Sequence, residues 1–352
     1  LRQTSGQERE YYVEGADAVP MVFMRKKNGW RCVAAMGPAT MAGQIKILPP
    51  APSNTCVFSW NDENDNGQVE AAEVKWHDVG KPNVLNGGWG YRCDRDLVWY
   101  HSGYAFKPVN FTPEGAPVYD VTKAVKLPGD LGNVVGDIYK TPSGYVANIP
   151  SGLPDPHGTV HGLNWFAGYD EKGNQLWIYP NYWQSVHGAM TAPMALPGVV
   201  MGALKITGIV KLDDGKGLFA IHGNIGQEFL IREDGMYVAE VFTDQRMAPA
   251  SLPATRNLKE VIGIPINDTT LGGEPFSGSF TRGRDGRVRI TYGSTDVRIA
   301  EVTGLDSIKE LKAQSLKVDD KMLAAAKAFK PKVAGAAATV CQISKGGAFS
   351  AD

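Results

Sequence analysis

Short runs of apolar, aromatic and β-branched residues alternate with polar turn residues over most of the chain. Clear examples are residues 218–222 leading into 229–242, and residues 287–292 leading into 296–302. Most runs are flanked by a turn dipeptide that ends in glycine, which is typical of β-hairpins. These dipeptides are Asn28-Gly29, Asn66-Gly67, Glu114-Gly115, Ser143-Gly144, Lys172-Gly173, Asp214-Gly215, Asp234-Gly235 and Asp285-Gly286. The pattern predicts an all-β fold, with no helix before residue 306.

The spacing of these motifs suggests a repeat architecture. They recur at roughly 40–50 residues, which is the period of propeller blades. We predict a β-propeller of about six to eight blades, with seven favoured, over residues 1–305. From Asp306 the composition shifts to Lys, Ala and Leu, which predicts a short helical or irregular tail or linker over 306–352. Because the chain starts at Leu1, with no initiator methionine and no signal-peptide pattern, we expect a piece of a longer chain or a processed product.

Composition narrows the classes of partner. The 36 Lys and Arg residues nearly balance the 37 Asp and Glu residues, so the net charge does not indicate binding to nucleic acid or to an anionic membrane. No apolar run reaches about 18 residues, so we predict no membrane span. The four cysteines (Cys32, Cys56, Cys93 and Cys341) are far apart, which leaves one or two disulfides open and excludes C-x-x-C metal or haem sites.

Residues 62–73 have the spacing of an EF-hand calcium loop. Side-chain oxygens occupy loop positions one, three and five, glycine occupies position six, and glutamates occupy positions nine and twelve. Calcium binds about six to eight oxygens, so alternate residues of a tight loop must supply short oxygen ligands. Gln68 would offer its backbone carbonyl, and Glu73 would close the shell with two oxygens. We therefore predict a Ca2+ site formed by Asp62, Asn64, Asn66, Gln68 and Glu73.

The residues that flank this loop are typical of strands. Residues 55–60 are rich in aromatic and β-branched side chains, and residues 74–79 alternate in polarity. Apolar Val69, at loop position eight, is where such loops anchor to the body of the protein. We expect a strand–loop–strand clip that stabilises a sheet, and not a helix-flanked sensor. The alternative is a solvated turn, because Asn, Asp and Gly favour turns for their own reasons.

Several segments carry a resemblance to secreted bacterial β-propeller proteins. Residues 58–60 running into the calcium loop, residues 111–120 and residues 299–306 look like segments of these proteins. Residues 169–177 are similar to the hairpin of pyrroloquinoline-quinone-like propeller repeats. The resemblance implies a propeller. It does not imply a quinone cofactor, because the vicinal cysteine pair of quinoprotein alcohol dehydrogenases is absent.

Four of the six histidines precede glycine: His157, His161, His187 and His222. In a propeller the innermost strand of each blade lines a central channel, where such histidines would converge. We predict that His161, His187 and His222 form a catalytic site with Mn, Fe, Zn or Cu. By analogy with propeller enzymes that cleave uronic-acid polysaccharides, the metal would neutralise a carboxylate while a His or Tyr acts as base. The alternative is that each imidazole bonds to the backbone of a turn.

An aromatic run at residues 179–183 is the predicted substrate-binding surface. We place this run in a loop, where Tyr179, Tyr182 and Trp183 would stack on sugar rings. The alternative is that these rings pack between blades, where aromatic side chains bury large apolar areas.

These observations favour a calcium-binding, extracellular or periplasmic propeller module that engages polysaccharide. Millimolar calcium outside cells suits a loop of this kind. Metal-dependent lyase or hydrolase chemistry at the histidines is one form of this function, and the pattern leaves open whether the chain is an enzyme. The opposing hypothesis is a non-catalytic binding or scaffold propeller with an extracellular protein partner. An oxidoreductase with a cofactor in the channel ranks lower.

Overall fold

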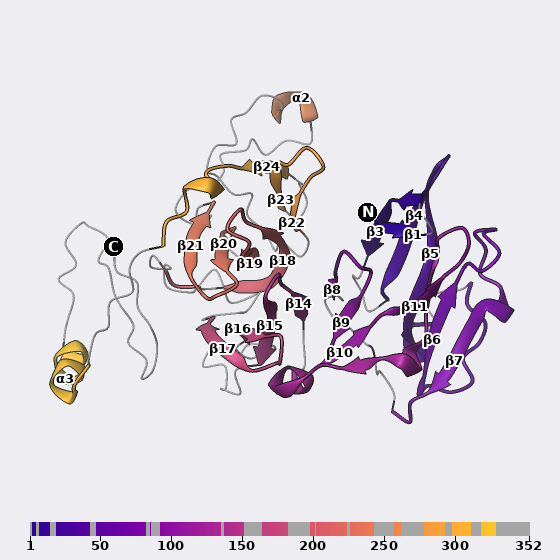
Figure 1. The fold of residues 1–352 in the computed structure, drawn as a ribbon, viewed down its shortest axis with the longest axis horizontal. Helices are drawn as coiled ribbons and strands as arrows, with labels where there is room; N and C mark the ends of the chain where they lie inside the picture. Colours follow the sequence, from indigo (N-terminus) through magenta and orange to yellow (C-terminus); the bar gives the residue numbers. More distant parts are fainter. Residues whose placement is uncertain are drawn as a thin grey trace.

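The computed structural model is an all-β protein, seen as a ribbon in Figure 1. It describes residues 2–4, 7–14, 19–42, 47–81, 85, 92–134, 137–150, 164–181, 198–200, 202–223, 226–242, 257–261, 278–292, 298–310 and 318–328. Every strand pairing within these residues is antiparallel, and five sheets of three or more strands form the blades of a β-propeller. The predicted fold class is confirmed.

The predicted number of blades, six to eight, differs from the five that the described residues form. The first blade uses five strands instead of four. The chain also uses residues 108–119 for a separate hairpin, β11–β12. Turn motifs mark hairpins and not blades, so counting them overestimates the number of blades.

Four of the five blades are meanders of consecutive strands, and the second blade is the exception. The first sheet contains β3 (Tyr11–Glu14), β4 (Met21–Lys26), β5 (Gly29–Pro38), β6 (Cys56–Asn61) and β7 (Val74–Asp78). The second contains β8 (Arg92–Cys93), β9 (Trp99–His101), β10 (Tyr104–Phe106) and β13 (Val125–Lys126). In this blade β13 pairs with β10 after the β11–β12 hairpin. The third contains β14 (Ile138–Lys140), β15 (Gly144–Pro150), β16 (Asn164–Asp170) and β17 (Gln175–Pro180).

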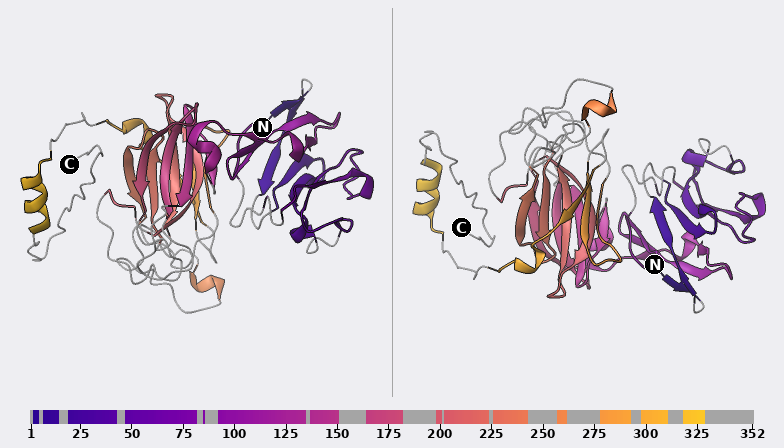
Figure 2. Two further views of the ribbon diagram at one scale, coloured as in Figure 1. Left: turned by 90° about the horizontal axis from the view of Figure 1, so that it is seen from below. Right: turned by 90° about the horizontal axis from the view of Figure 1, so that it is seen from above.

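The last two blades follow the same plan. The fourth contains β18 (Ala203–Lys211), β19 (Gly217–Gly223), β20 (Glu228–Arg232) and β21 (Tyr237–Val241). The fifth contains β22 (Ser279–Arg282), β23 (Val288–Tyr292) and β24 (Arg298–Val302). Two further hairpins pair β1 (Arg2–Thr4) with β2 (Gln7–Arg9), and β11 (Pro108–Phe111) with β12 (Pro117–Tyr119). Figure 2 shows strands β14–β24, magenta to orange, gathered as adjacent layers.

The hydrophobic core consists of clusters between consecutive sheets. Phe219 and Ile221 of β19 pack in one cluster with Phe166 of the preceding blade. The intervening Ala220 packs in another cluster with Phe280 of the following blade. Successive side chains of a strand point to opposite faces, so a strand that is apolar throughout is covered on both sides. Burying each large apolar side chain contributes about 1.5–3 kcal/mol.

Helices are few and short among the described residues. They are α1 (Ala39–Ala42), α2 (Leu258–Val261) and α3 (Asp320–Ala328), with 3-10 turns at Ala71–Glu73, Val121–Lys123, Gly129–Asn133 and Leu305–Ser307. The expectation of no helix before residue 306 is therefore wrong for α1 and α2, single turns that carry no apolar periodicity. Within the tail predicted to be helical or irregular, the structure forms α3. None of the described helices has the length and apolar character needed to cross a membrane.

Three cysteines within the described residues are free thiols: Cys32, Cys56 and Cys93. Cys32 and Cys56 lie on different strands of the first sheet, and Cys93 lies in the second. Burial raises the pKa of the Cys32 thiol to about 11. No disulfide joins these three residues, and Cys341 lies outside the described part of the chain.

Candidate functional site

The predicted calcium loop connects β6 to β7, so the expected strand–loop–strand arrangement is confirmed. A 3-10 turn, Ala71–Glu73, closes the loop and brings Glu73 back to the start of the segment. Val69 packs against the cluster formed by Phe58, Trp60 and Val74. The loop is thus anchored by an apolar side chain, while its oxygen-bearing residues turn the backbone.

Three side-chain oxygens of the loop bond to backbone N–H groups ahead of them. Oδ1 of Asn64 accepts from the Asn66 N–H at 3.1 Å, and Oδ1 of Asn66 accepts from the Gln68 N–H at 2.7 Å. Oδ2 of Asp62 accepts from the Gly67 N–H at 3.0 Å. Gly67 adopts φ +74°, a conformation that favours glycine. These hydrogen bonds curl the backbone of the loop, as Asn and Asp side chains do in turns.

Asp62 and Glu73 are the two buried carboxylates of the loop, with exposed fractions of 1% and 4%. Glu73 accepts from the Glu63 N–H at 2.9 Å and from the Trp60 indole N–H at 3.0 Å. In contrast, Oδ1 of Asp62 is buried and has no hydrogen-bond partner. Burial raises the pKa of the Asp62 carboxyl, opposed by the Gly67 N–H and by Arg31. A bound cation would satisfy an oxygen of this kind.

Cationic side chains surround the outside of the loop. Arg31 places Nε 3.6 Å from Oδ2 of Asp62, and it also pairs with Asp65. Lys26 contacts the same Asp65 carboxylate at 2.5 Å. Although burial raises the pKa of Asp65, the hydrogen bonds from Lys26 and Arg31 lower it overall. These two cations compensate part of the acidic charge of the loop and would weaken its attraction for calcium.

No cluster of three or more His, Cys, Asp and Glu side chains is placed to hold a metal within the described residues. The predicted calcium set contains only two such side chains, Asp62 and Glu73. Its other ligands are two asparagine side chains and the Gln68 carbonyl, which are hard oxygen donors that calcium accepts. The donor chemistry therefore fits calcium and does not fit zinc or copper.

His222 is the one predicted catalytic histidine within the described residues, because His161 and His187 lie outside them. It stands near the end of β19, directly across from Glu228 of β20. Its Nδ1 contacts Oε1 of Glu228, and both residues are almost fully buried. Nε2 of His222 and Oε2 of Glu228 have no hydrogen-bond partner. The alternative interpretation, a backbone-bonded turn histidine, does not describe this contact.

The environment of His222 keeps its imidazole neutral. Burial, reinforced by the charge of Lys205, lowers the pKa of His222 to about 3 in spite of the contact with Glu228. A neutral ring that donates Nδ1–H to a carboxylate presents a lone pair at Nε2. That is the form in which histidine binds a metal or accepts a proton.

The expected position of His222 on the innermost strand of its blade is wrong. β19 pairs with a strand on each side, β18 and β20, whereas the innermost strand of a blade has a neighbour on one side only. The His222-Gly223 dipeptide marks the end of a buried strand, and a buried strand need not be the one that lines the channel. Glu228 was not anticipated as its partner. A signal existed, since a β-hairpin over 217–232 pairs these two positions.

Of the predicted sugar-binding residues, Tyr182 and Trp183 lie outside the described residues. Tyr179 lies in β17 and not in the predicted loop. Its ring stacks on Tyr237 with centroids 6.3 Å apart, and its hydroxyl donates to the Gly198 carbonyl. Burial raises its pKa to about 12. Tyr179 thus follows the packing alternative, in which aromatic rings fill the space between elements.

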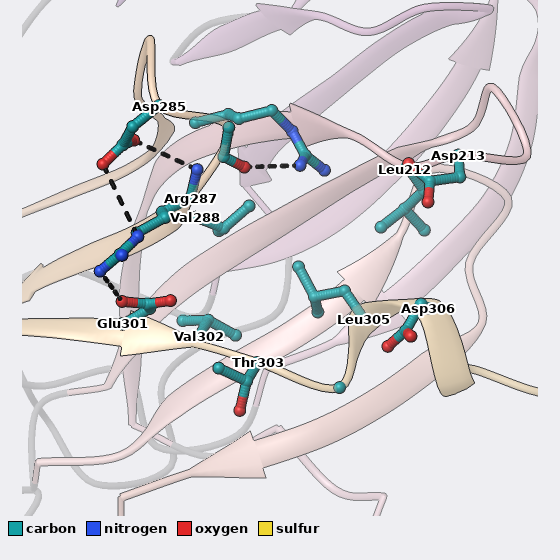
Figure 3. A pocket seen from close by; sticks show the side chains of 13 residues that line it. Leu212, Asp213, Asp285, Arg287, Val288, Glu301, Val302, Thr303, Leu305 and Asp306 are labelled. Atoms are coloured by element: carbon teal, nitrogen blue, oxygen red, sulfur yellow. Dashed lines mark hydrogen bonds and ion pairs between the residues drawn. The ribbon is translucent and has the colours of Figure 1, made fainter.

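A surface recess of about 380 Å³ lies beside the last blade, lined from β23, β24 and the turn that follows (Figure 3). Its charged side chains bond mainly to the protein itself. Arg287 pairs with Glu301 at 3.2 Å, and Arg282 donates to the carbonyls of Gly286 and Lys211 at 2.9 and 3.1 Å. The arginines of the recess are therefore satisfied within the protein, whereas the carboxylates of Asp213 and Asp306 have no ion pair among the described residues.

Comparison with known proteins does not assign the chain to a family. No family model matches it, and no curated protein matches it significantly.

Proposed function

We propose that this chain is a calcium-binding β-propeller module that works outside the cytoplasm and engages polysaccharide. The observation that supports the calcium part is the Oδ1 atom of Asp62, buried without a hydrogen-bond partner in a loop whose backbone is curled by side-chain hydrogen bonds. Leaving such an atom bare costs about 1–3 kcal/mol. A calcium ion would remove that cost.

The position of the loop supports a stabilising role. β6 is buried along its whole length, whereas β7 is the outermost strand of the first sheet. A cation held between Asp62, at the end of β6, and Glu73, just before β7, would fix the edge strand to the interior of the sheet. Since strands flank the loop on both sides, binding has no helix pair to open. We therefore propose a clip and not a switch.

Metal analysis tests this proposal directly. Plasma mass spectrometry of the purified protein, followed by calcium titration after chelation, should give one calcium per chain. Asp62→Asn should lose that calcium. Glu63→Gln is the matched control, because Glu63 stands at loop position two and supplies no predicted ligand. Equal binding by Asp62→Asn and the unaltered chain would refute the site.

A second candidate function is metal-dependent chemistry at His222. The observation that favours it is the arrangement of a carboxylate on Nδ1 and an unpartnered Nε2, as found behind metal-binding histidines. Near-stoichiometric Mn, Fe, Zn or Cu should then be lost in His222→Gln, and Glu228→Gln should weaken binding about 10–100-fold. The control is His77→Gln, which alters a histidine of the first sheet. A protein free of transition metal after loading would exclude this candidate.

A further inference from the structure

The outer face of the first sheet carries an exposed group of aromatic side chains, Tyr12, Phe23 and Trp30, which we name the Tyr12 platform. Tyr12 is 50% exposed and Trp30 is 47% exposed, while Phe23 is half-buried. The opposite face of the same sheet is covered, since Val22 and Met24 of β4 lie in the core. The platform is therefore the exposed part of the second face, the rest of which is covered where Met21 and Cys32 pack with the buried Phe58 and Trp60.

The ring of Tyr12 contacts both of the other rings. Tyr12 of β3 lies directly across from Phe23 of β4, with ring centroids 5.7 Å apart. The ring of Tyr12 also meets Trp30 of β5 edge-on, with centroids 6.3 Å apart. The hydroxyl of Tyr12 donates to Glu14 at 2.7 Å, which orients the ring. Contiguous exposed apolar side chains are one kind of feature that marks a binding surface.

Arg25 supplies a positive charge at this surface. Its guanidinium carbon lies 5.5 Å from the centroid of the Trp30 ring, and its side chain is exposed. No ion pair of Arg25 is found within the described residues, unlike Lys26 and Arg31, which both pair with Asp65. Arg25 also lines an open recess of about 220 Å³ together with Arg9, Lys26, Asp65 and Glu114. A guanidinium in this position is available to a carboxylate brought by a ligand.

We propose that the Tyr12 platform binds a polysaccharide whose sugar rings carry carboxylates. This inference rests on the proposed engagement of polysaccharide and locates it at a surface different from residues 179–183. The apolar faces of sugar rings lie on Tyr12 and Trp30, and a ring carboxylate takes both N–H groups of one edge of Arg25. Phe23 packs against the ring of Tyr12.

Affinity electrophoresis tests the platform with two matched polymers, polygalacturonate and its methyl ester, at a calcium concentration too low for gelling. We expect the unaltered chain to bind the acid more tightly than the ester. Trp30→Ala should weaken binding of both polymers, by about tenfold for the acid. Arg25→Gln should reduce binding of the acid to the level of the ester. The matched control is Tyr104→Ala, which removes an exposed tyrosine from the second blade.

Each other outcome overturns a defined part of the argument. If the unaltered chain binds the acid and Trp30→Ala binds equally well, the platform is wrong while polysaccharide engagement stands. If the unaltered chain binds neither polymer, the platform and the engagement of polysaccharide are both overturned. The calcium site is tested separately by titration. If sedimentation shows a dimer that Trp30→Ala dissociates, the platform is covered by a second copy of the chain instead of by sugar.

Discussion

The β6–β7 hairpin buries the carboxylates of Asp62 and Glu73, and the β19–β20 hairpin buries the carboxylate of Glu228. In the first hairpin, Asp62 and Glu73 bond to backbone and indole N–H groups of the same hairpin. In the second, Glu228 faces His222 across the strand pair. Both hairpins leave one carboxylate oxygen without a partner, on Asp62 and on Glu228.

The difference lies in what buries each carboxylate. The calcium loop makes its own enclosure, because its asparagines bond to N–H groups two residues ahead. The His222–Glu228 pair is covered by other elements. A Cβ added at Gly278, before β22, would lie 3.7 Å from the imidazole of His222. The calcium loop thus forms within one short segment, whereas the His222–Glu228 site forms only when the blades pack together.

The largest expected effect comes from breaking the assembled site. Glu228→Ala should lower the free energy of unfolding by about 2–4 kcal/mol, because it leaves the Nδ1–H group of neutral His222 buried without its acceptor and opens a cavity beside it. Urea denaturation measures this change. Glu228→Gln is the control, since it keeps an oxygen opposite Nδ1 and should cost clearly less. Equal losses for the two variants would mean that the contact contributes nothing specific.

Calcium removal should produce the next largest effect, this time at the locally built site. At a calcium concentration of 100 times the Kd, binding stabilises the folded state by about 2.7 kcal/mol. Chelation should therefore lower Tm of the unaltered chain and leave Asp62→Asn unchanged. Thermal unfolding with and without chelator measures the shift. A chelator effect that persists in Asp62→Asn would place the stabilising ion elsewhere.

Acid should separate the two sites further. Burial lowers the pKa of His222 to about 3, from 6.5 for the free side chain. Between these values the unfolded chain binds a proton that the folded chain does not. Stability should therefore fall as the pH drops from 6.5 towards 3, by about 1.4 kcal/mol per pH unit.

Denaturation at several pH values, compared with His222→Gln, isolates this contribution, which the variant should lack. A rise in stability on acidification through the same range would show that Glu228 holds a protonated imidazole. At the loop, the expected pH dependence is that of the calcium affinity. Since burial raises the pKa of Asp62, calcium affinity should begin to fall at a higher pH than for an ordinary aspartate.

The smallest expected effect concerns the turn of the loop. Gly67 and Gly80 have φ values of +74° and +71°, so alanine at either position should cost about 1–2 kcal/mol. Only at Gly67 would the new Cβ meet a neighbour, at 2.6 Å from Cδ of Arg31. Gly67→Ala should therefore also weaken calcium binding, as measured by titration, while Gly80→Ala should not. Equal calcium affinities would show that Arg31 yields without disturbing the loop.

Much of the fold was predictable because it follows from short-range patterns. The run at 55–60 became β6, and the runs at 218–222 and 287–292 fall in β19 and β23. The Asp234-Gly235 dipeptide lies in the turn between β20 and β21, with Gly235 at φ +89°. The number of blades was not predictable in this way, because turn motifs do not reveal how many strands one sheet contains.

The candidate sites divide along the same line. The loop at 62–73 was predicted with its flanking strands, since every bond that curls it joins residues close in sequence. The Tyr12 platform was missed, because nothing along the chain distinguishes an exposed ring from a buried one. Tyr179 shows the converse error, a ring predicted to be exposed that stacks on Tyr237.

The sequence by itself determined the antiparallel β class, the hairpin turns and the curled loop of Asp62, because these depend on alternation, backbone conformation and hydrogen bonds over a few residues. The tertiary structure alone decided the blade count, the burial of His222 against Glu228 and the exposure of Tyr12 and Trp30. Those features depend on which sheet covers which face. Covering is a contact between segments distant in the chain, and local patterns do not encode it.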